Sequence, residues 1–169
     1  MSSKKLLLLN REQIRQKINR IAYQILEDNL DEEELVIAGI FEKGYAIAKH
    51  IKENLEHIST LQVTLIRIDI QRESPDLRAS TPIDLSEIYH KAVIIVDDVL
   101  NTGRTMAYSL GLFLHVPMKK LRTVVLIDRN HRIFPISPTF TGLQLATVSQ
   151  EYVEVILNKE NEEEAVYLN

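Results

Sequence analysis

One stretch in the middle of the chain constrains the fold more than any other. Residues 92–96, Ala-Val-Ile-Ile-Val, are too few for a buried helix but have the length of a strand covered on both faces. Two adjacent carboxylates, Asp97 and Asp98, follow where such a strand would leave the core. A turn with one glycine comes next, and apolar residues then recur at helical spacing as far as residues 116–117. This order predicts a ligand site at the carboxyl end of a parallel strand.

Strand and helix patterns alternate on both sides of this stretch. Residues 10–29 predict an amphipathic helix, with Asn10 as its N-cap and Gln13 completing a capping box. A second helix is predicted through residues 47–55. Strands are predicted at residues 35–40, 62–70, 121–127 and 152–157. We therefore expect an α/β fold in which residues 1–169 form a single domain, with a parallel sheet flanked by helices.

Two segments lack these periods. Residues 71–89 begin with a polar run that contains two prolines, and they predict a loop. A loop of this length inside a compact domain is either functional or disordered. Residues 158–169 form an acidic tail.

The composition excludes several classes of protein. The 169-residue chain has no cysteine, which excludes disulfides and thiolate metal sites and makes a reducing cytoplasm the expected location. No apolar stretch reaches membrane-spanning length, so we expect no membrane partner. The net charge of −4 argues against a dedicated nucleic-acid binder. A local basic group remains open to three interpretations, a solvated face, an RNA face or a subunit contact, and comprises Lys119, Lys120, Arg122, Arg129 and Arg132.

The acidic pair and the turn after it match the chemistry of a phosphorylated ribose. Carboxylates accept hydrogen bonds from hydroxyls, so Asp97 and Asp98 suit a vicinal diol, although the pair alone is better explained as solvated or helix-capping acids. Backbone amides of residues 100–105, at a helix N-terminus, form an anion site, whose simpler alternative is an ordinary capped turn. Gly103 permits close approach and Arg104 adds positive charge. Together, the two features predict a diol on the acids and a 5′-phosphate on the turn.

Residues 96–105, Val-Asp-Asp-Val-Leu-Asn-Thr-Gly-Arg-Thr, resemble the signature with which type I phosphoribosyltransferases bind 5-phosphoribosyl 1-pyrophosphate (PRPP). The form of the motif is most similar to the bifunctional pyrimidine-operon attenuators that are also uracil phosphoribosyltransferases. Further matches at residues 19–22, 43–44, 68–70, 128–132 and 135–136 extend the resemblance over nearly the whole chain. It implies an enzyme that moves ribose 5-phosphate from PRPP to a nucleobase, uracil, giving UMP and pyrophosphate. It also implies Mg²⁺ as cofactor, a homodimer or homotetramer, and RNA as a further partner.

The resemblance also assigns roles to individual residues. It implies that residues 69–81, which overlap the segment 71–89, belong to a mobile loop that closes over the site. The catalytic residues would be Lys43, Arg72, Asp97 and Asp98, and the two aspartates would also contact the metal. The base would lie against Ile127 and Asp128. PRPP binding falls on Lys43, Gly44, Asp97, Asp98, Val99, Leu100, Asn101, Thr102, Gly103, Arg104 and Thr105.

Departures from the family pattern define an alternative. The expected mobile loop is several residues shorter than in the attenuators, and residues 73–76, Glu-Ser-Pro-Asp, replace its usual Tyr-Arg-Asp-Asp core. This favours a second hypothesis, a nucleotide-sensing RNA-binding attenuator of pyrimidine genes with little catalysis. The family has histidine on its RNA-facing side at the position of Tyr23, and this difference argues against RNA binding. His131 lies in a polar turn and is interpreted as structural or surface-exposed rather than as an acid–base residue.

Overall fold

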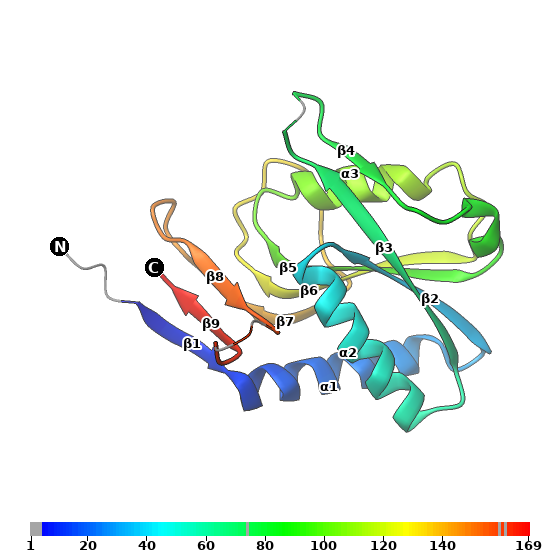
Figure 1. Ribbon diagram of the computed structural model, residues 1–169, viewed down its shortest axis with the longest axis horizontal. Helices are drawn as coiled ribbons and strands as arrows, with labels where there is room; N and C mark the ends of the chain where they lie inside the picture. Colours follow the sequence, from blue (N-terminus) through cyan, green and yellow to red (C-terminus); the bar gives the residue numbers. More distant parts are fainter. Residues whose placement is uncertain (1–4, 74, 159, 161) are drawn as a thin grey trace.

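The protein is built on a six-stranded sheet with the order β4-β3-β2-β5-β6-β7 (Figure 1). The computed structural model describes residues 5–73, 75–158, 160 and 162–169. Strands β3, β2, β5, β6 and β7 run parallel to one another, and the short edge strand β4 is antiparallel to β3. This confirms the predicted parallel sheet and adds an antiparallel edge. The strands are β2 Glu34–Ile40, β3 Gln62–Gln71, β4 Arg78–Ser80, β5 Ala92–Leu100, β6 Lys120–Asp128 and β7 Phe140–Gln144.

Helices cover both faces of the sheet, as predicted. Helices α1 (Arg11–Asp28) and α2 (Lys43–Ile58) lie on one face, and α3 (Arg104–Phe113) lies on the other (Figure 1). The predicted capping box begins α1, because the side chains of Asn10 and Gln13 each accept a hydrogen bond of 2.9 Å from the backbone N–H of the other. Helix α3 ends before the predicted 116–117. None of the helices in the described residues has the length and apolar character needed to span a membrane.

The two faces of the sheet bury separate apolar clusters. The larger cluster packs α1 and α2 against the sheet and includes Ile18, Ile51 and Ile94. The smaller one packs α3 against the other face, through Met106 and Phe113. Alternate residues of β5 enter different clusters, which is why its apolar run is continuous rather than alternating. The strand is therefore held rigidly on both sides as far as the acidic pair.

A second sheet, which the sequence did not indicate, joins the two ends of the described chain. It has three antiparallel strands, in the order β1-β9-β8: β1 (Leu6–Asn10), β9 (Ala165–Leu168) and β8 (Val153–Ile156). The predicted acidic tail, residues 158–169, thus contains a strand, and its residues 159 and 161 lie outside the described residues. Val153, Val155 and Val166 are buried with α1 in the larger cluster.

Residues 71–89 are more regular than predicted. Strand β4 pairs with the end of β3, so the segment begins as a hairpin, and a 3₁₀ helix, η1, occupies Leu85–Ile88. Asp84 caps η1 by accepting a hydrogen bond of 3.0 Å from the N–H of Ser86. The predicted loop core at residues 73–76 includes residue 74, which lies outside the described residues. The prediction of an irregular segment was therefore wrong for β4 and η1.

Candidate functional site

The turn between β5 and α3 presents the N-terminus of α3. Gly103 is the N-cap of this helix and has φ of +86°, in the left-handed region that favours glycine. The hydroxyl of Thr102 accepts a hydrogen bond of 3.3 Å from the N–H of Arg104. The first N–H groups of a helix have no partner within it, and the helix dipole adds positive potential there. The turn therefore has the geometry that an anion site requires, and anion binding by these residues stays a prediction.

Residues 132–136 support the turn from behind. The carbonyl of Thr102 accepts hydrogen bonds from the N–H groups of Ile133 at 2.8 Å and Phe134 at 2.9 Å. The guanidinium of Arg132 donates to the carbonyl of Asn101 at 3.0 Å. Because these bonds engage carbonyls, they fix the backbone of the turn without occupying its N–H groups.

The acidic pair lies within β5 and not after it. The strand continues to Leu100 because Val99 and Leu100 still pair with β6, so the predicted strand end before Asp97 was wrong. Asp97 is 7% exposed. Burial, and next the charge of Asp98, raise the pKa of Asp97 well above its usual value. A nearby cation or hydroxyl donor would favour the ionised carboxylate of this residue.

The start of α2 packs directly on β5 at the acidic pair. A Cβ atom on Gly44 would lie 2.5 Å from the carbonyl oxygen of Val96 and 2.9 Å from the Cα of Asp97. Only glycine allows this approach. Lys43 is the first residue of α2, and the peptide bond between Phe41 and Glu42 just before it is cis. Lys43 and Gly44 are therefore next to the acidic pair, although neither lines the cavity described below.

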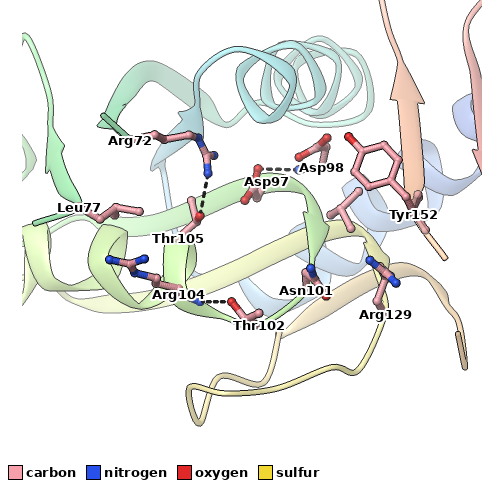
Figure 2. Close-up of a pocket in the computed structure, with 12 residues that line it drawn as sticks. Arg72, Leu77, Asp97, Asp98, Asn101, Thr102, Arg104, Thr105, Arg129 and Tyr152 are labelled. Atoms are coloured by element: carbon pink, nitrogen blue, oxygen red, sulfur yellow. Dashed lines mark hydrogen bonds between the residues drawn. The ribbon is translucent and has the colours of Figure 1, made fainter. Parts of the chain in front are cut away.

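Arg72 approaches the turn from the β3–β4 hairpin. It follows β3, and its guanidinium donates a hydrogen bond of 3.4 Å to the hydroxyl of Thr105 on α3. Figure 2 shows the side chain reaching toward Thr105 and Asp97. Its charge also acts to lower the pKa of Asp97, against the larger effects of burial and Asp98. The β3–β4 hairpin thus brings a cation to both halves of the predicted site.

These residues line one open cavity of about 510 Å³ (Figure 2). It joins eight predicted site residues, of which Arg72 comes from the hairpin and the others from β5, the turn and α3. Of the remaining predicted residues, Leu100 is buried and Gly103 lies in the turn wall. The lining comprises Arg72, Leu77, Asp97, Asp98, Val99, Asn101, Thr102, Arg104, Thr105, Arg129, Tyr152 and Val153.

The predicted base-binding residues do not reach the cavity wall. Ile127 is fully buried in the larger cluster. Asp128 is 5% exposed, and its carboxylate accepts hydrogen bonds from Arg132 at 2.6 Å and from the N–H of Asn130 at 2.9 Å. Both hydrogen bonds shape the loop after β6. The role of Asp128 in this structure is to order that loop.

Sequence reasoning missed four residues of the lining: Leu77, Arg129, Tyr152 and Val153. Tyr152 is 59% exposed, and Figure 2 shows its ring reaching from the start of β8 toward Asp98. Tyr152 and Val153 come to the cavity only because the second sheet packs beside β5. Of these four residues, only Arg129 stood out in the sequence. It did so as a member of the basic group, yet the structure buries it.

The cavity combines a carboxylate pair with three arginines. Asp97 and Asp98 share the lining with Arg72 and Arg104, which suits a ligand that carries both hydroxyls and phosphate charges, whereas the guanidinium of Arg129 is hydrogen-bonded to residues 147–151. Among the described residues there is no cluster of three or more His, Cys, Asp or Glu side chains suited to a metal. Two carboxylates alone fit Mg²⁺, which keeps several waters and shares its ligands with substrate phosphates.

Residues 7–155 match the phosphoribosyl transferase domain. The chain belongs to the phosphoribosyltransferase family. Curated relatives extend the match over nearly the full length. Bifunctional protein PyrR of Fusobacterium nucleatum is 36% identical, with 99% of this chain and 100% of that protein covered. Bifunctional protein PyrR of Brevibacillus brevis is 37% identical, with 90% of each chain covered.

Solved phosphoribosyltransferase structures share the fold at lower identity. The hypoxanthine phosphoribosyltransferase of Trypanosoma cruzi superposes with a TM-score of 0.79 at 19% identity, covering 96% of this chain and 95% of that one. A hypoxanthine-guanine phosphoribosyltransferase of Bacillus anthracis gives 0.77 at 20% identity, covering 95% of both. The family predicted from the motif, and the single-domain α/β fold, are thus confirmed.

Proposed function

We propose that this phosphoribosyltransferase transfers ribose 5-phosphate from PRPP to a ring nitrogen of uracil, giving UMP and pyrophosphate. The observation that carries the proposal is the placing of the acidic pair and the α3 anion site in one cavity. Membership of the family supports PRPP as the donor. The resemblance of the motif to the pyrimidine-operon attenuators, together with the similarity to PyrR proteins over nearly the full length, supports a pyrimidine as the acceptor.

The ligand contacts follow from the chemistry of the lining. The ribose diol would donate hydrogen bonds to Asp97 and Asp98, and the 5′-phosphate would accept them from the turn at residues 101–105. The flat base would lie between Tyr152 and the end of β6, where an aromatic ring can stack on it. Ile127 and Asp128 would define this end of the site through the backbone, since their side chains are buried.

The reaction breaks the bond between C1′ of the ribose and a pyrophosphate oxygen and forms a bond from C1′ to the base nitrogen. The base loses its N–H proton, and pyrophosphate leaves with the electrons of the broken bond. Positive charge develops on the ribose, so the acidic pair is well placed to hold the sugar while Arg72 and Lys43 neutralise the pyrophosphate. When bound, Mg²⁺ would offset further charge on the pyrophosphate. Asp97 and Asp98 would provide its protein ligands.

The direct test is a panel of nucleobases. The protein is incubated with PRPP and Mg²⁺ together with uracil, cytosine, hypoxanthine, guanine or adenine, and pyrophosphate release is measured. We expect release with uracil and at least about tenfold less with each other base, since an unpaired polar group in the base site opposes the wrong base. Release with a purine alone would change the assigned acceptor. No release with any base would refute the transferase activity.

A second candidate function is RNA binding, for which the bifunctional name of the relatives is the specific observation. In this role the chain would sense PRPP or nucleotides and attenuate transcription of pyrimidine genes with little catalysis. The basic group gives it little support, because its surface members are neutralised by acids of α1 and the loop that follows. Lys119 pairs with Glu32 at 2.7 Å, and Asp28 pairs with Lys120 at 3.2 Å and Arg122 at 3.0 Å.

A gel shift with pyrimidine-operon leader RNA at two salt concentrations separates the two functions. Specific binding that weakens as salt rises would support the regulator. Rapid turnover without a shift would reject it.

We also propose a homodimer or homotetramer, on the resemblance to the family. Light scattering on the purified protein measures the assembly.

A further inference from the structure

Arg129 is a buried cation at the cavity wall. It is only 5% exposed, and within the described part of the chain no carboxylate forms an ion pair with it. Burying a charge is costly unless the group is well hydrogen-bonded. A guanidinium has five N–H donors in a fixed planar arrangement, so its contacts define a geometry.

Within the described residues, the side-chain hydrogen bonds of Arg129 all fall on one short segment, residues 147–151. Its Nε donates to the hydroxyl of Thr147 at 3.1 Å. Its Nη2 donates to the carbonyl of Glu151 at 2.5 Å and to that of Val148 at 3.4 Å. The next two residues along the chain, Tyr152 and Val153, line the cavity. Arg129 therefore holds the segment that delivers them.

The backbone of Arg129 is also fixed, to the end of β5. The backbone N–H of Arg129 donates to the carbonyl of Leu100 at 3.0 Å, at the end of β5 and directly before the anion-binding turn. Nearby, His131 Nε2 lies 2.5 Å from the carbonyl of Thr147. The backbone and side chain of Arg129 thus join the acidic strand to the 147–151 segment. Figure 2 shows Arg129 below Tyr152, at the same end of the cavity.

We propose that Arg129 is a positioning residue that fixes Tyr152 and Val153 at the cavity wall and thereby sets affinity for the nucleobase half of the ligand. This inference rests on the proposed function. The phosphate half depends on the turn at residues 101–105, and Arg129 reaches only Leu100, directly before this turn, through its backbone N–H. Loss of the side chain therefore weakens ligands that carry a base and spares ligands that lack one.

The experiment compares UMP with ribose 5-phosphate, which lacks the base, by calorimetry on three variants. Arg129→Gln removes the charge and most of the donors, whereas Arg129→Lys keeps the charge and loses the planar arrangement. Arg20→Gln is the matched control, because the Arg20 guanidinium also donates to two backbone carbonyls, those of Thr141 and Gly142, both at 2.8 Å. Arg20 lies outside the cavity lining.

For Arg129→Gln we expect UMP affinity to fall about tenfold or more, the size of a lost charged hydrogen-bond network, with ribose 5-phosphate affinity within about twofold of the parent. Arg129→Lys should recover part of the loss. Hydrogen exchange of peptides spanning residues 147–153 should accelerate in Arg129→Gln but not in Arg20→Gln. If Arg129→Gln does not fold, Arg129→Lys provides the same comparison through a smaller fall in UMP affinity.

Equal falls for both ligands, or unchanged affinity for both, would overturn the inference. So would a parent protein that binds neither ligand. A parent that binds UMP more tightly than ribose 5-phosphate, yet releases no pyrophosphate with any base, refutes the transferase activity alone. In that case the difference between the two ligands still decides whether Arg129 has the positioning role.

Discussion

The Oδ1 atom of Asp97 accepts a hydrogen bond of 2.9 Å from the backbone N–H of Asp98. This contact holds the first carboxylate against the strand, where it is 7% exposed, while the second acid is more open to the cavity. Burial and the neighbouring charge raise the pKa of Asp97. The two adjacent acids are therefore unequal, and we expect their substitutions to have different effects on stability.

Asp97→Asn should stabilise the ligand-free protein. The ionised form of a buried carboxylate is unfavourable in the folded state, and asparagine removes this cost while keeping an acceptor for the N–H of Asp98. We expect the free energy of unfolding at neutral pH, measured by urea titration with a chelator present, to rise by about 0.5–2 kcal/mol, as in other stabilising changes at functional sites. PRPP affinity should fall. A less stable variant would contradict the assigned cost of burial.

Asp98→Asn should weaken PRPP binding and leave stability nearly unchanged. The side chain of Asp98 is only half-buried, and its carboxylate interacts with that of Asp97, an interaction that an asparagine amide can also make. We expect the dissociation constant for PRPP with Mg²⁺, measured by calorimetry, to rise about tenfold or more, the size of a lost charged hydrogen bond. The thermal midpoint should shift by less than a few degrees. Unchanged PRPP affinity would argue against the diol contact.

Apart from Arg72, the predicted residues that line the cavity are nearly continuous in sequence. Strand β5, its acids and the α3 turn occupy adjacent residues, so the apolar run, the carboxylates and Gly103 could be interpreted together. The capping box at Asn10 was predictable for the same reason, since its two members are three residues apart. Local order along the chain is what periodicity and capping patterns encode.

The missed part of the site depends on contacts between distant residues. Tyr152 reaches the cavity because β8 pairs with β9, and β9 pairs with β1 at the other end of the chain. A strand was predicted at residues 152–157, but β1 and β9 have only five and four residues, too few for a clear pattern, so the pairing that places β8 was not predictable. Arg129 was assigned to a basic surface because its acceptors are mostly backbone carbonyls, which no sequence pattern reveals.

Gly44→Ala should destabilise the protein and impair PRPP binding. The new methyl group would meet backbone atoms of Val96 and Asp97, which cannot move without disturbing β5. We expect a loss of about 1–3 kcal/mol in the free energy of unfolding, typical of overpacking. Gly111→Ala is the control, because a Cβ at this position of α3 has no neighbour within 4 Å. It should raise stability by up to about 1 kcal/mol. Equal effects of the two substitutions would refute the steric argument.

Stability should fall on mild acidification because of His50. Burial, and next the charge of Arg15, lower the pKa of His50 below the ordinary 6.5, against the opposing charges of Glu53 and Glu164. Above pH 6.5 the imidazole is neutral in both states. As the pH falls through this value, the unfolded chain gains a proton that the folded chain does not, so stability decreases until the folded-state pKa is passed.

His50→Gln should flatten this dependence. We expect the urea midpoint of the parent to drop between pH 7 and pH 5 by an amount equivalent to about 1 kcal/mol or less, given the partial exposure of the site. The variant should lose less stability over the same range. Parallel pH profiles for the two proteins would show that other groups control the acid response.

Tyr152→Ala should weaken binding of the base while leaving binding of the phosphate nearly unchanged. Arg129→Gln should have the same effect, but Tyr152 acts on the base directly. Figure 2 shows its ring reaching toward Asp98, at the end of the cavity where we propose that the base binds, and stacking of an aromatic ring on a base is worth about 1–3 kcal/mol. We expect KM for uracil to rise about fivefold or more and KM for PRPP to change by less than about twofold, measured by pyrophosphate release. Tyr152→Phe keeps the ring and should remain close to the parent. If the phenylalanine variant loses as much as the alanine variant, the hydroxyl of Tyr152 provides the contact in place of the ring.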